Sequence, residues 1–470
     1  MSTDSTRSGR DFTRTLLTTV IVLALLAGTL ALLNTTRGPR LESAAINLGS
    51  VIAHPGQRLL LNTDQPISSI NRDQITVTPK VPVSVAVDGT VVTITFENAL
   101  NYNTDYRVNI DPVIGLFQGA QASIEYDFTT DDVDLYTLHR DSGTTGDGTK
   151  RPDAIRRDTL LGTGAGRALF TAERIQEFAV LPGHLAVVTL DQENMNHLTL
   201  FSLTEETELE IVLPSNTVLK DLQTSRTTNL IGFTLTDVPV AGDEYPADTL
   251  YTYDVNEQTA VPQAVVGVDQ QPLPVTDYVF VPDTTSLVAH GLEGGLYLIN
   301  VTVEGDIVPL GQHVEMRGLI PGTNSLVVAD PTQGASIDLS DSTVTPLDLP
   351  ADDELGDAIP AKLEVLNRDG RYVRLYHAWD TDGTSRPLLA LSDHGGSSFV
   401  YVPAAKGTEI RDFCVSPNGQ YVAVETFPRD GESDQYPTLP GSSAMMTTFV
   451  DLSTGVSNRS INGFLPHWCK

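Results

Sequence analysis

The chain has 470 residues, of which 40% are hydrophobic, so it can bury sizeable cores and should form two or more domains. Acidic residues outnumber basic ones 60 to 29, which gives a net charge of −31. Because this charge repels phosphate backbones, we expect no nucleic acid partner. The acidic residues are spread along the chain and indicate either a solvated surface or a patch that captures cations or a basic partner.

Residues 16–33 form an uninterrupted uncharged run, LLTTVIVLALLAGTLALL. A membrane-spanning helix needs about 17–25 residues, so the run predicts a single-pass transmembrane helix. Basic residues at 7, 10 and 14 precede it, and the positive-inside rule therefore places a tail of residues 1–15 in the cytoplasm and the bulk of the chain outside the cell membrane. The alternative is a cleaved signal peptide, although no Ala-x-Ala site follows and its apolar core is usually shorter, about 7–15 residues.

The chain has two cysteines, Cys414 and Cys469, which both lie outside the membrane in this topology. An oxidising environment permits a disulfide between them. Two unpaired, buried thiols are the alternative. No CxxC motif or Cys/His cluster indicates a metal site.

A polar linker at residues 34–43 leads into a region of short strands and turns at residues 44–131. About seven strands in fewer than 100 residues predict a β-sandwich, and Asp88-Gly89 lies where a tight hairpin turn is expected. The clearest alternating segments are 57–63, 74–79, 83–96, 106–110 and 124–130.

The order of motifs in this region is specific enough to suggest a family. Gln65-Pro66 is followed by VTP, then DGTVVTITF, then an alternating Leu100–Val108 run and a closing Tyr-x-Phe-Thr-Thr. This order resembles the bacterial Ig-like domains of the SbsA type. The resemblance implies a spacer or adhesion module without catalytic residues.

Residues 132–470 contain an internal repeat in which an apolar strand end, a turn and a second apolar strand recur. Markers at the turns are separated by 43, 57, 39, 47 and 49 residues, a period typical of propellers or solenoids. The six copies are 179–188, 222–233, 280–289, 319–328, 365–376 and 415–424. A third strand follows each copy and a fourth follows several of them, so each repeat predicts one four-stranded propeller blade.

The C-terminal GFLPHWCK matches the start of a further repeat, but the chain stops there. The rest of that blade is expected near 134–140, 153–161 and 167–173, because a blade built from both ends leaves no strand edge open. The predicted fold is therefore all-β, with a transmembrane helix, an Ig-like sandwich and a propeller. Seven blades are favoured, and six or eight stay open.

One repeat carries a recognisable turn. Residues 416–419 read Ser-Pro-Asn-Gly, and this resembles the TolB-type propeller repeat, in which the third residue is usually Asp. The other copies keep only a Pro or a Gly. The resemblance implies the fold and assigns no functional residue.

Catalytic motifs are absent: the sequence has no G-x-S-x-G, S-x-x-K or H-E-x-x-H. Acidic clusters at 131–134 and 380–383 do not continue as EF-hand loops, so calcium is unsupported and no cofactor is predicted. Two long loops place Tyr-Pro beside carboxylates and predict an acidic binding face with aromatic anchors. The residues of this face are Asp243, Glu244, Tyr245, Asp248, Glu432, Asp434 and Tyr436.

The sequence thus predicts a bacterial envelope protein that presents an acidic propeller outside the membrane. We expect a binding or scaffold role with a protein or peptide partner rather than an enzyme. A hydrolase with its site in the propeller channel is the alternative. A sensor is disfavoured because the cytoplasmic tail leaves little room for an output domain.

Overall fold

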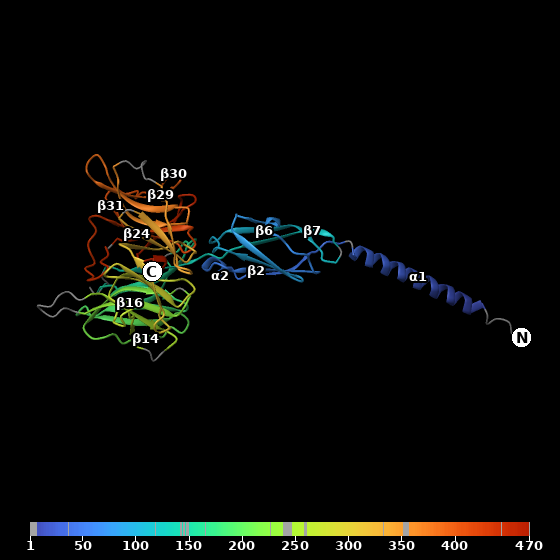
Figure 1. The fold of residues 1–470 in the computed structure, drawn as a ribbon, viewed down its shortest axis with the longest axis horizontal. Coiled ribbons are helices and arrows are strands. Elements are labelled where there is room, and N and C mark those ends of the chain that lie inside the picture. The colour runs from blue at the N-terminus through green and yellow to red at the C-terminus, as the bar shows by residue number, and fades with distance from the viewer. Residues whose placement is uncertain are drawn as a thin grey trace. The chain divides into compact units, whose positions relative to one another are not determined.

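The structure is a computed structural model. It describes residues 7–469 apart from 36, 118, 142, 144, 145, 147–149, 165, 226, 238–246, 258–260, 332, 351–356 and 443, and the side chains of the first helix only from 12 to 28. The chain divides into two units, Met1–Asp131 and Asp132–Lys470 (Figure 1).

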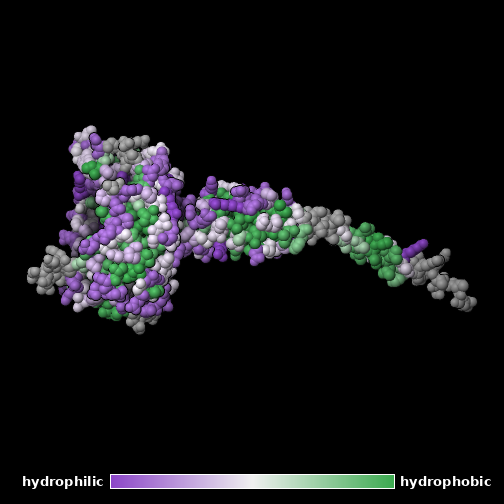
Figure 2. Space-filling view, viewed as in Figure 1, coloured by the Kyte–Doolittle hydropathy of each residue, from purple (hydrophilic) through white to green (hydrophobic). Residues whose placement is uncertain are grey.

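Helix α1 (Arg7–Thr35) contains the segment that was predicted to span a membrane. Its described side chains are exposed, and many of them are large and apolar, as the colouring of Figure 2 shows. Among the residues that the structure describes, no helix is long and apolar enough to cross a membrane. The anchoring role of residues 16–33 stays a prediction.

The rest of the first unit is a sandwich of two antiparallel sheets, with strand orders β1-β2-β5-β4 and β3-β6-β7. The predicted turn at Asp88-Gly89 joins β4 to β5, and Gly89 has a φ of +60°, which favours glycine. The strands are β1 (Leu41–Ala45), β2 (Arg58–Thr63), β3 (Ile75–Thr78), β4 (Val83–Asp88), β5 (Val91–Phe96), β6 (Asp105–Ile114) and β7 (Gln121–Thr129), with a short helix α2 (Leu48–Ala53) after β1.

Alternating residues of these strands form the sandwich core. Along β5, Val92, Ile94 and Phe96 are fully buried, while the residues between them are less so. Tyr106 of β6 stacks on Phe128 of β7 with ring centroids 5.5 Å apart, and its hydroxyl accepts a hydrogen bond from a backbone N–H. The period of two in the sequence therefore predicted which side chains are inside.

The second unit contains, in its described part, six four-stranded antiparallel sheets and a three-stranded sheet. Within each four-stranded sheet the strands follow one another in chain order, which is the arrangement of a propeller blade. The first and innermost strands are β11 (Ile175–Leu181), β15 (Thr217–Thr224), β19 (Val275–Phe280), β23 (Glu315–Leu319), β27 (Ile359–Val365) and β31 (Thr408–Val415).

Each inner strand continues into a second, third and fourth strand. The second strands are β12 (His184–Leu190), β16 (Leu230–Asp237), β20 (Ser286–Gly291), β24 (Ser325–Asp330), β28 (Tyr372–Trp379) and β32 (Tyr421–Pro428). The third are β13 (Asn196–Ser202), β17 (Thr249–Asp254), β21 (Gly295–Asn300), β25 (Gln333–Asp338), β29 (Ser385–Asp393) and β33 (Met446–Asp451). The fourth are β14 (Glu208–Ile211), β18 (Gln263–Ala264), β22 (Ile307–Gln312), β26 (Thr343–Pro346), β30 (Gly396–Tyr401) and β34 (Ser457–Asn462). All six predicted repeats fall on first and second strands of these sheets.

The seventh sheet combines the two ends of the unit. It contains β8 (Asp134–His139), β9 (Asp153–Thr159) and β10 (Arg167–Ala172), in the order β10-β9-β8. Phe464 pairs with Leu138 of β8 through two backbone hydrogen bonds of 2.8 and 2.9 Å, so the C-terminal segment takes the inner position. The two ends of the unit therefore meet in one sheet, as the sequence predicted, and the number of blades stays a prediction.

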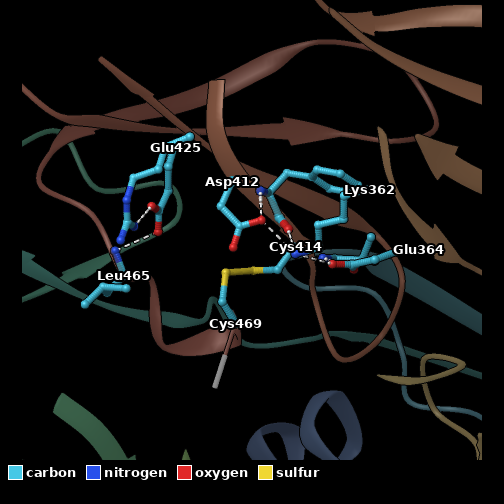
Figure 3. Close-up of a disulfide and its surroundings, with 10 residues drawn as sticks. Lys362, Glu364, Asp412, Cys414, Glu425, Leu465 and Cys469 are labelled. Atoms are coloured by element: carbon cyan, nitrogen blue, oxygen red, sulfur yellow. Dashed lines mark hydrogen bonds and ion pairs between the residues drawn. A yellow bond between two sulfur atoms is a disulfide. The ribbon is translucent and has the colours of Figure 1, made fainter. Parts of the chain in front are cut away.

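A disulfide joins Cys414 of β31 to Cys469, with Cα atoms 5.3 Å apart (Figure 3). The predicted pairing is confirmed, and the alternative of two free thiols is excluded in this structure. The bond links the sixth sheet to the segment that completes the seventh. Trp468 packs edge-on against Phe449, with ring centroids 5.1 Å apart, and buries the same segment.

We predict that removing this bond destabilises the second unit. Loop-closure entropy for cysteines separated by 55 residues corresponds to about 4 kcal/mol. A Cys414→Ala/Cys469→Ala variant should lose free energy of unfolding of this order in urea titrations. Reductant should weaken the wild-type protein and leave the double variant unchanged; equal stability of all four samples would show that the bond does not hold the closure.

Candidate functional site

Each of the six inner strands carries a β-bulge in its pairing with the next strand, and a charged residue stands at each bulge. A bulge changes the direction in which a side chain points, and it is therefore a common device near binding sites. These bulge residues are Glu177, Asp221, Asp277, Arg317, Lys362 and Asp412.

Several inner-strand polar groups form hydrogen bonds between neighbouring sheets. Glu177 of β11 accepts from the backbone N–H of Leu222 in β15 at 3.2 Å. Tyr278 of β19 donates its hydroxyl proton to the backbone carbonyl of Asp221 in β15 at 2.6 Å. Because these backbone groups face a neighbouring sheet rather than their own ladder, the side chains satisfy them and link the sheets.

The densest of these links joins β27 to β31 (Figure 3). Lys362 donates to the Asp412 carboxylate at 2.7 Å and to a backbone carbonyl at 2.6 Å, and it lies 3.2 Å from Glu364. Glu364 accepts from the backbone N–H of Val415 at 2.9 Å. Burial raises the pKa of Glu364. Burial also disfavours the charged form of Lys362, but the neighbouring carboxylates of Glu364 and Asp412 outweigh this effect and raise the pKa of Lys362.

A similar link completes the closure on the other side of β31. Glu425 of β32 is buried, pairs with Arg411 at 2.5 Å and accepts from the backbone N–H of Leu465 at 2.7 Å (Figure 3). A buried carboxylate of this kind is strongly disfavoured without its partners. Glu425 therefore holds the C-terminal segment against β32 through its hydrogen bond with Leu465.

Asp277 of β19 differs from the other bulge carboxylates. Its carboxylate accepts one hydrogen bond, from the adjacent Tyr278 N–H at 2.8 Å, and among the described residues no basic side chain forms an ion pair with it. Asp277 is exposed by surface area, and it lines a cavity among the inner strands, where neighbouring protein limits its contact with bulk water. The surrounding protein displaces water and raises the pKa of Asp277 to about 6; Asp221 adds to the rise, whereas His290 and Lys362 oppose it.

Two cavities meet at this residue. One, of about 520 Å³, lies among the inner strands of five sheets and the C-terminal segment, and the other, of about 600 Å³, lies beside the loops of the third and fourth four-stranded sheets. Asp277, Glu315 and Met316 line both cavities. The exposed side chains of Leu292 and Val314 line the outer cavity, so it offers apolar as well as acidic surface.

Two histidines line the outer cavity. His290 is buried, with its Nε2 2.9 Å from the backbone carbonyl of His313 and its Nδ1 3.1 Å from the hydroxyl of Thr276. His313 Nδ1 lies 3.0 Å from Asp330, and this hydrogen bond lowers the pKa of Asp330. Asp330 is therefore an anion at neutral pH, so the cavity combines it with the more readily protonated Asp277.

The outer cavity can hold a cationic group against Asp277 and an apolar group against its rim. In the described part of the chain, no set of three or more His, Cys, Asp or Glu residues is arranged to hold a metal ion. The chemistry that these side chains support directly is recognition of a basic side chain, with Asp277 also suited to exchange a proton near pH 6.

The predicted loop face is only partly described. Asp243, Glu244 and Tyr245 lie outside the described residues. Asp248 accepts hydrogen bonds from the Lys220 ammonium at 2.9 and 3.2 Å and from the Thr236 hydroxyl. Its carboxylate therefore joins loop to strand instead of standing free.

The second loop contradicts the expectation of an exposed aromatic anchor. Glu432 is exposed, but Tyr436 is only 4% exposed and donates its hydroxyl proton to Asp153. The Arg140 guanidinium lies 3.6 Å from the centre of the Tyr436 ring and pairs with Asp434 at 2.6 Å. The loop folds back because Arg140, from the start of the unit, supplies a buried cation that needs these partners.

Arg140 also binds the closing sheet to the first four-stranded sheet. Its Nε donates to the backbone carbonyl of Ile175 at 3.0 Å, and its Nη2 donates to that of Gln176 at 2.5 Å. Burial and the nearby Asp153 carboxylate raise the pKa of Tyr436, so its hydroxyl stays protonated and donating. Of the residues expected to bind a partner in this loop, Asp434 and Tyr436 make structural contacts, and Glu432 is exposed.

The sequence did contain a signal for the bulge residues, although it was not used. A charged residue followed by an apolar one precedes the turn in most repeats, as in Asp277-Tyr278, Lys362-Leu363 and Asp412-Phe413. A charge at a regular position of otherwise apolar inner strands is costly unless it has a partner or a function. Aligning the repeats on this position marks all six bulge residues as candidates, and it does not distinguish Asp277 from the other five.

We predict that Tyr436→Ala destabilises the second unit by about 3 kcal/mol, because it removes a buried ring from the Arg140 guanidinium and a hydrogen bond from the buried Asp153 carboxylate. Tyr436→Phe should cost about 1 kcal/mol. Urea unfolding measures both effects. Glu432→Ala, an exposed position on the same loop, is the control and should change little; an unaltered Tyr436→Ala protein would show that the loop is not part of the core.

Asp277 should give a pH-dependent stability. Its native pKa of about 6 lies above the ordinary value, so ionisation destabilises the fold as pH rises from about 4 to 6 and the full cost is present above that. Asp277→Asn removes this cost. The melting temperature of the variant should match that of the wild type at pH 4 and exceed it at pH 7.5. The corresponding difference in the free energy of unfolding at pH 7.5 is about 1 kcal/mol, because solvent screens this partly exposed carboxylate. A difference in melting temperature between variant and wild type that does not change with pH would contradict the raised pKa of Asp277.

Comparison with known proteins identifies the first unit. Residues 35–130 match the family model described as bacterial Ig-like domain. The predicted Ig-like fold is confirmed, whereas the SbsA type stays a prediction. No curated protein matches the chain in sequence.

Solved structures similar to the chain include β-propeller and TolB-like proteins. An oligogalacturonate lyase in complex with manganese has 13% identity and a TM-score of 0.42, over 75% of this chain and 98% of that one. A protein described as TolB from Agrobacterium tumefaciens has 11% identity and a TM-score of 0.31, over 71% and 91%. The β-propeller domain of Cps50 (Swd1) from Myceliophteria thermophila has 12% identity and a TM-score of 0.35, over 60% and 84%. Residues 35–130 thus match a bacterial Ig-like domain, and the strand orders of the second unit are those of propeller blades.

Proposed function

We propose that this chain is a protein-interaction scaffold of the bacterial envelope, held at the membrane by residues 16–33 with its bulk outside. The Ig-like unit acts as the spacer, and the seven sheets of the second unit are the blades of a closed propeller. Two features support this location. One is the apolar run with basic residues before it, and the other is the disulfide, which is typical of oxidising compartments.

The partner is a protein or peptide that places a basic side chain against Asp277. The observation that carries this proposal is the contrast between Asp277 and two of its counterparts. Lys362 and Asp412 pair with each other between sheets, whereas Asp277 lines two cavities and forms no ion pair with a described basic side chain. An uncompensated carboxylate costs stability, and such residues are common where a ligand supplies the missing charge.

The apolar rim of the outer cavity adds to this recognition. Leu292 and Val314 are 51% and 68% exposed, next to the acidic residues that line the same cavity. A basic residue with apolar neighbours in an extended peptide would bury these side chains and pair with Asp277. The net charge of −31 would speed the encounter with such a partner.

A hydrolase is the second candidate, and one observation favours it. Asp277, with a pKa raised to about 6, has the property of a general acid or base, and it lies in a cavity with His290. The described residues offer no activated nucleophile to complete such a site. A hydrolase would require Asp277 for turnover, whereas a scaffold would require it for capture alone.

Site-specific photo-crosslinking on intact cells tests the proposed scaffold function. A p-benzoyl-phenylalanine at Val314, on the rim of the outer cavity, should crosslink a partner, and Asp277→Asn should lower the yield about tenfold, the loss of about 1.4 kcal/mol. The matched control is the same group at Val344 of β26, which is 51% exposed on an outer strand. Equal crosslinking from both positions, or a yield unaffected by Asp277→Asn, would contradict the proposal.

A further inference from the structure

The hairpin between β6 and β7 ends in two exposed apolar side chains, Leu116 and Phe117. Leu116 is 55% exposed, and Phe117, at 81%, is the most exposed large apolar side chain among the described residues. Tyr106 and Phe128, on the two strands of the same hairpin, are buried instead. We call Leu116 and Phe117 the hairpin tip. Adjacent apolar side chains this exposed are a common sign of a contact surface.

The hairpin tip is fixed beside the point at which the chain leaves α1. The backbone N–H of Leu116 donates to the carbonyl of Pro66 at 2.9 Å, and the neighbouring Gln65 donates its side-chain amide to the carbonyl of Arg37 at 3.0 Å. Arg37 is two residues beyond Thr35, where α1 ends, so it can lie no more than about 7 Å from the helix end. Chain connectivity alone thus keeps the hairpin tip close to the end of the predicted membrane segment.

Basic side chains accompany the hairpin tip. Arg37 and Arg40 are exposed, and together with β7 they line a cavity of about 420 Å³. Glu125 is the acidic residue of that cavity, and Asp64 accepts from the backbone N–H of Arg40 at 2.9 Å. Guanidinium groups are well suited to bind phosphate, and two of them here follow directly on an apolar helix.

We propose that this end of the Ig-like unit rests on the lipid bilayer, with the hairpin tip inserted at the boundary between headgroups and acyl chains and with Arg37 and Arg40 on lipid phosphates. The inference rests on the proposed membrane anchoring and adds a second contact to it. The bilayer is the occupant because the segment predicted to lie in it ends next to the hairpin tip. Aromatic and basic side chains are the residues that anchor proteins at this depth.

Tryptophan quenching by brominated lipid tests the insertion in the full chain. Phe117→Trp protein is reconstituted in vesicles of phosphatidylglycerol and phosphatidylcholine, with bromine on the upper acyl carbons of the latter. The control is Asn98→Trp, an exposed site in the loop before β6, and the ten residues of β6 place it about 30 Å from the hairpin tip. The two native tryptophans, Trp379 and Trp468, are common to both variants.

We expect bromine to quench the fluorescence introduced at Phe117 at least twice as strongly as that at Asn98, and Arg37→Ala/Arg40→Ala to reduce this difference. Flotation of the vesicles distinguishes membrane anchoring by residues 16–33 from insertion of the hairpin tip. If the protein floats but the two variants are quenched equally, anchoring stands and the tip contact is wrong. A blue-shifted but unquenched Phe117→Trp signal would overturn the contact in favour of a second copy or another protein. Failure to float would overturn both proposals.

Discussion

The second unit depends on one constraint, which is that a ring of sheets must close without leaving a free strand edge. The pairing of Phe464 with Leu138 meets it, because the C-terminal segment takes the inner position beside β8. Phe464, Leu465 and Trp468 of this short segment are buried, and the segment has two further links. The Cys414–Cys469 disulfide and the hydrogen bond from Leu465 to buried Glu425 supply them. Closure is thus covalent and electrostatic as much as hydrophobic.

The same inner strands both hold the unit together and create its candidate site. Bulges direct charged side chains across the gaps between sheets, where Lys362 and Glu364 satisfy backbone groups of β31. Asp277 stands at the equivalent bulge but has no such role, and two cavities open beside it. The proposal that a ligand binds there rests on this difference, because a carboxylate without a link between sheets is open to an external partner.

Much of the fold could be predicted from the sequence because it depends on local periodicity. Alternation in β5 placed Val92 and Ile94 in the core, and the recurring turns placed the first and second strands of every four-stranded sheet. The sequence also permitted the disulfide, since both cysteines were predicted to lie outside the membrane. The site could not be predicted in this way. Burial of Tyr436 depends on Arg140 at the far end of the unit, and the openness of Asp277 depends on what neighbouring sheets leave unfilled.

Amide hydrogen exchange at Leu138 and Phe464 tests the closure most directly, because each of these two N–H groups donates to the other residue's carbonyl. In the oxidised protein both amides should be protected as strongly as those of the inner strands. Reduction of the disulfide should release Phe464 first, since the segment then keeps only its noncovalent links. If Phe464 in the oxidised protein exchanged as fast as an unstructured terminus, the C-terminal segment would not close the ring, and the seventh sheet would lack its inner strand.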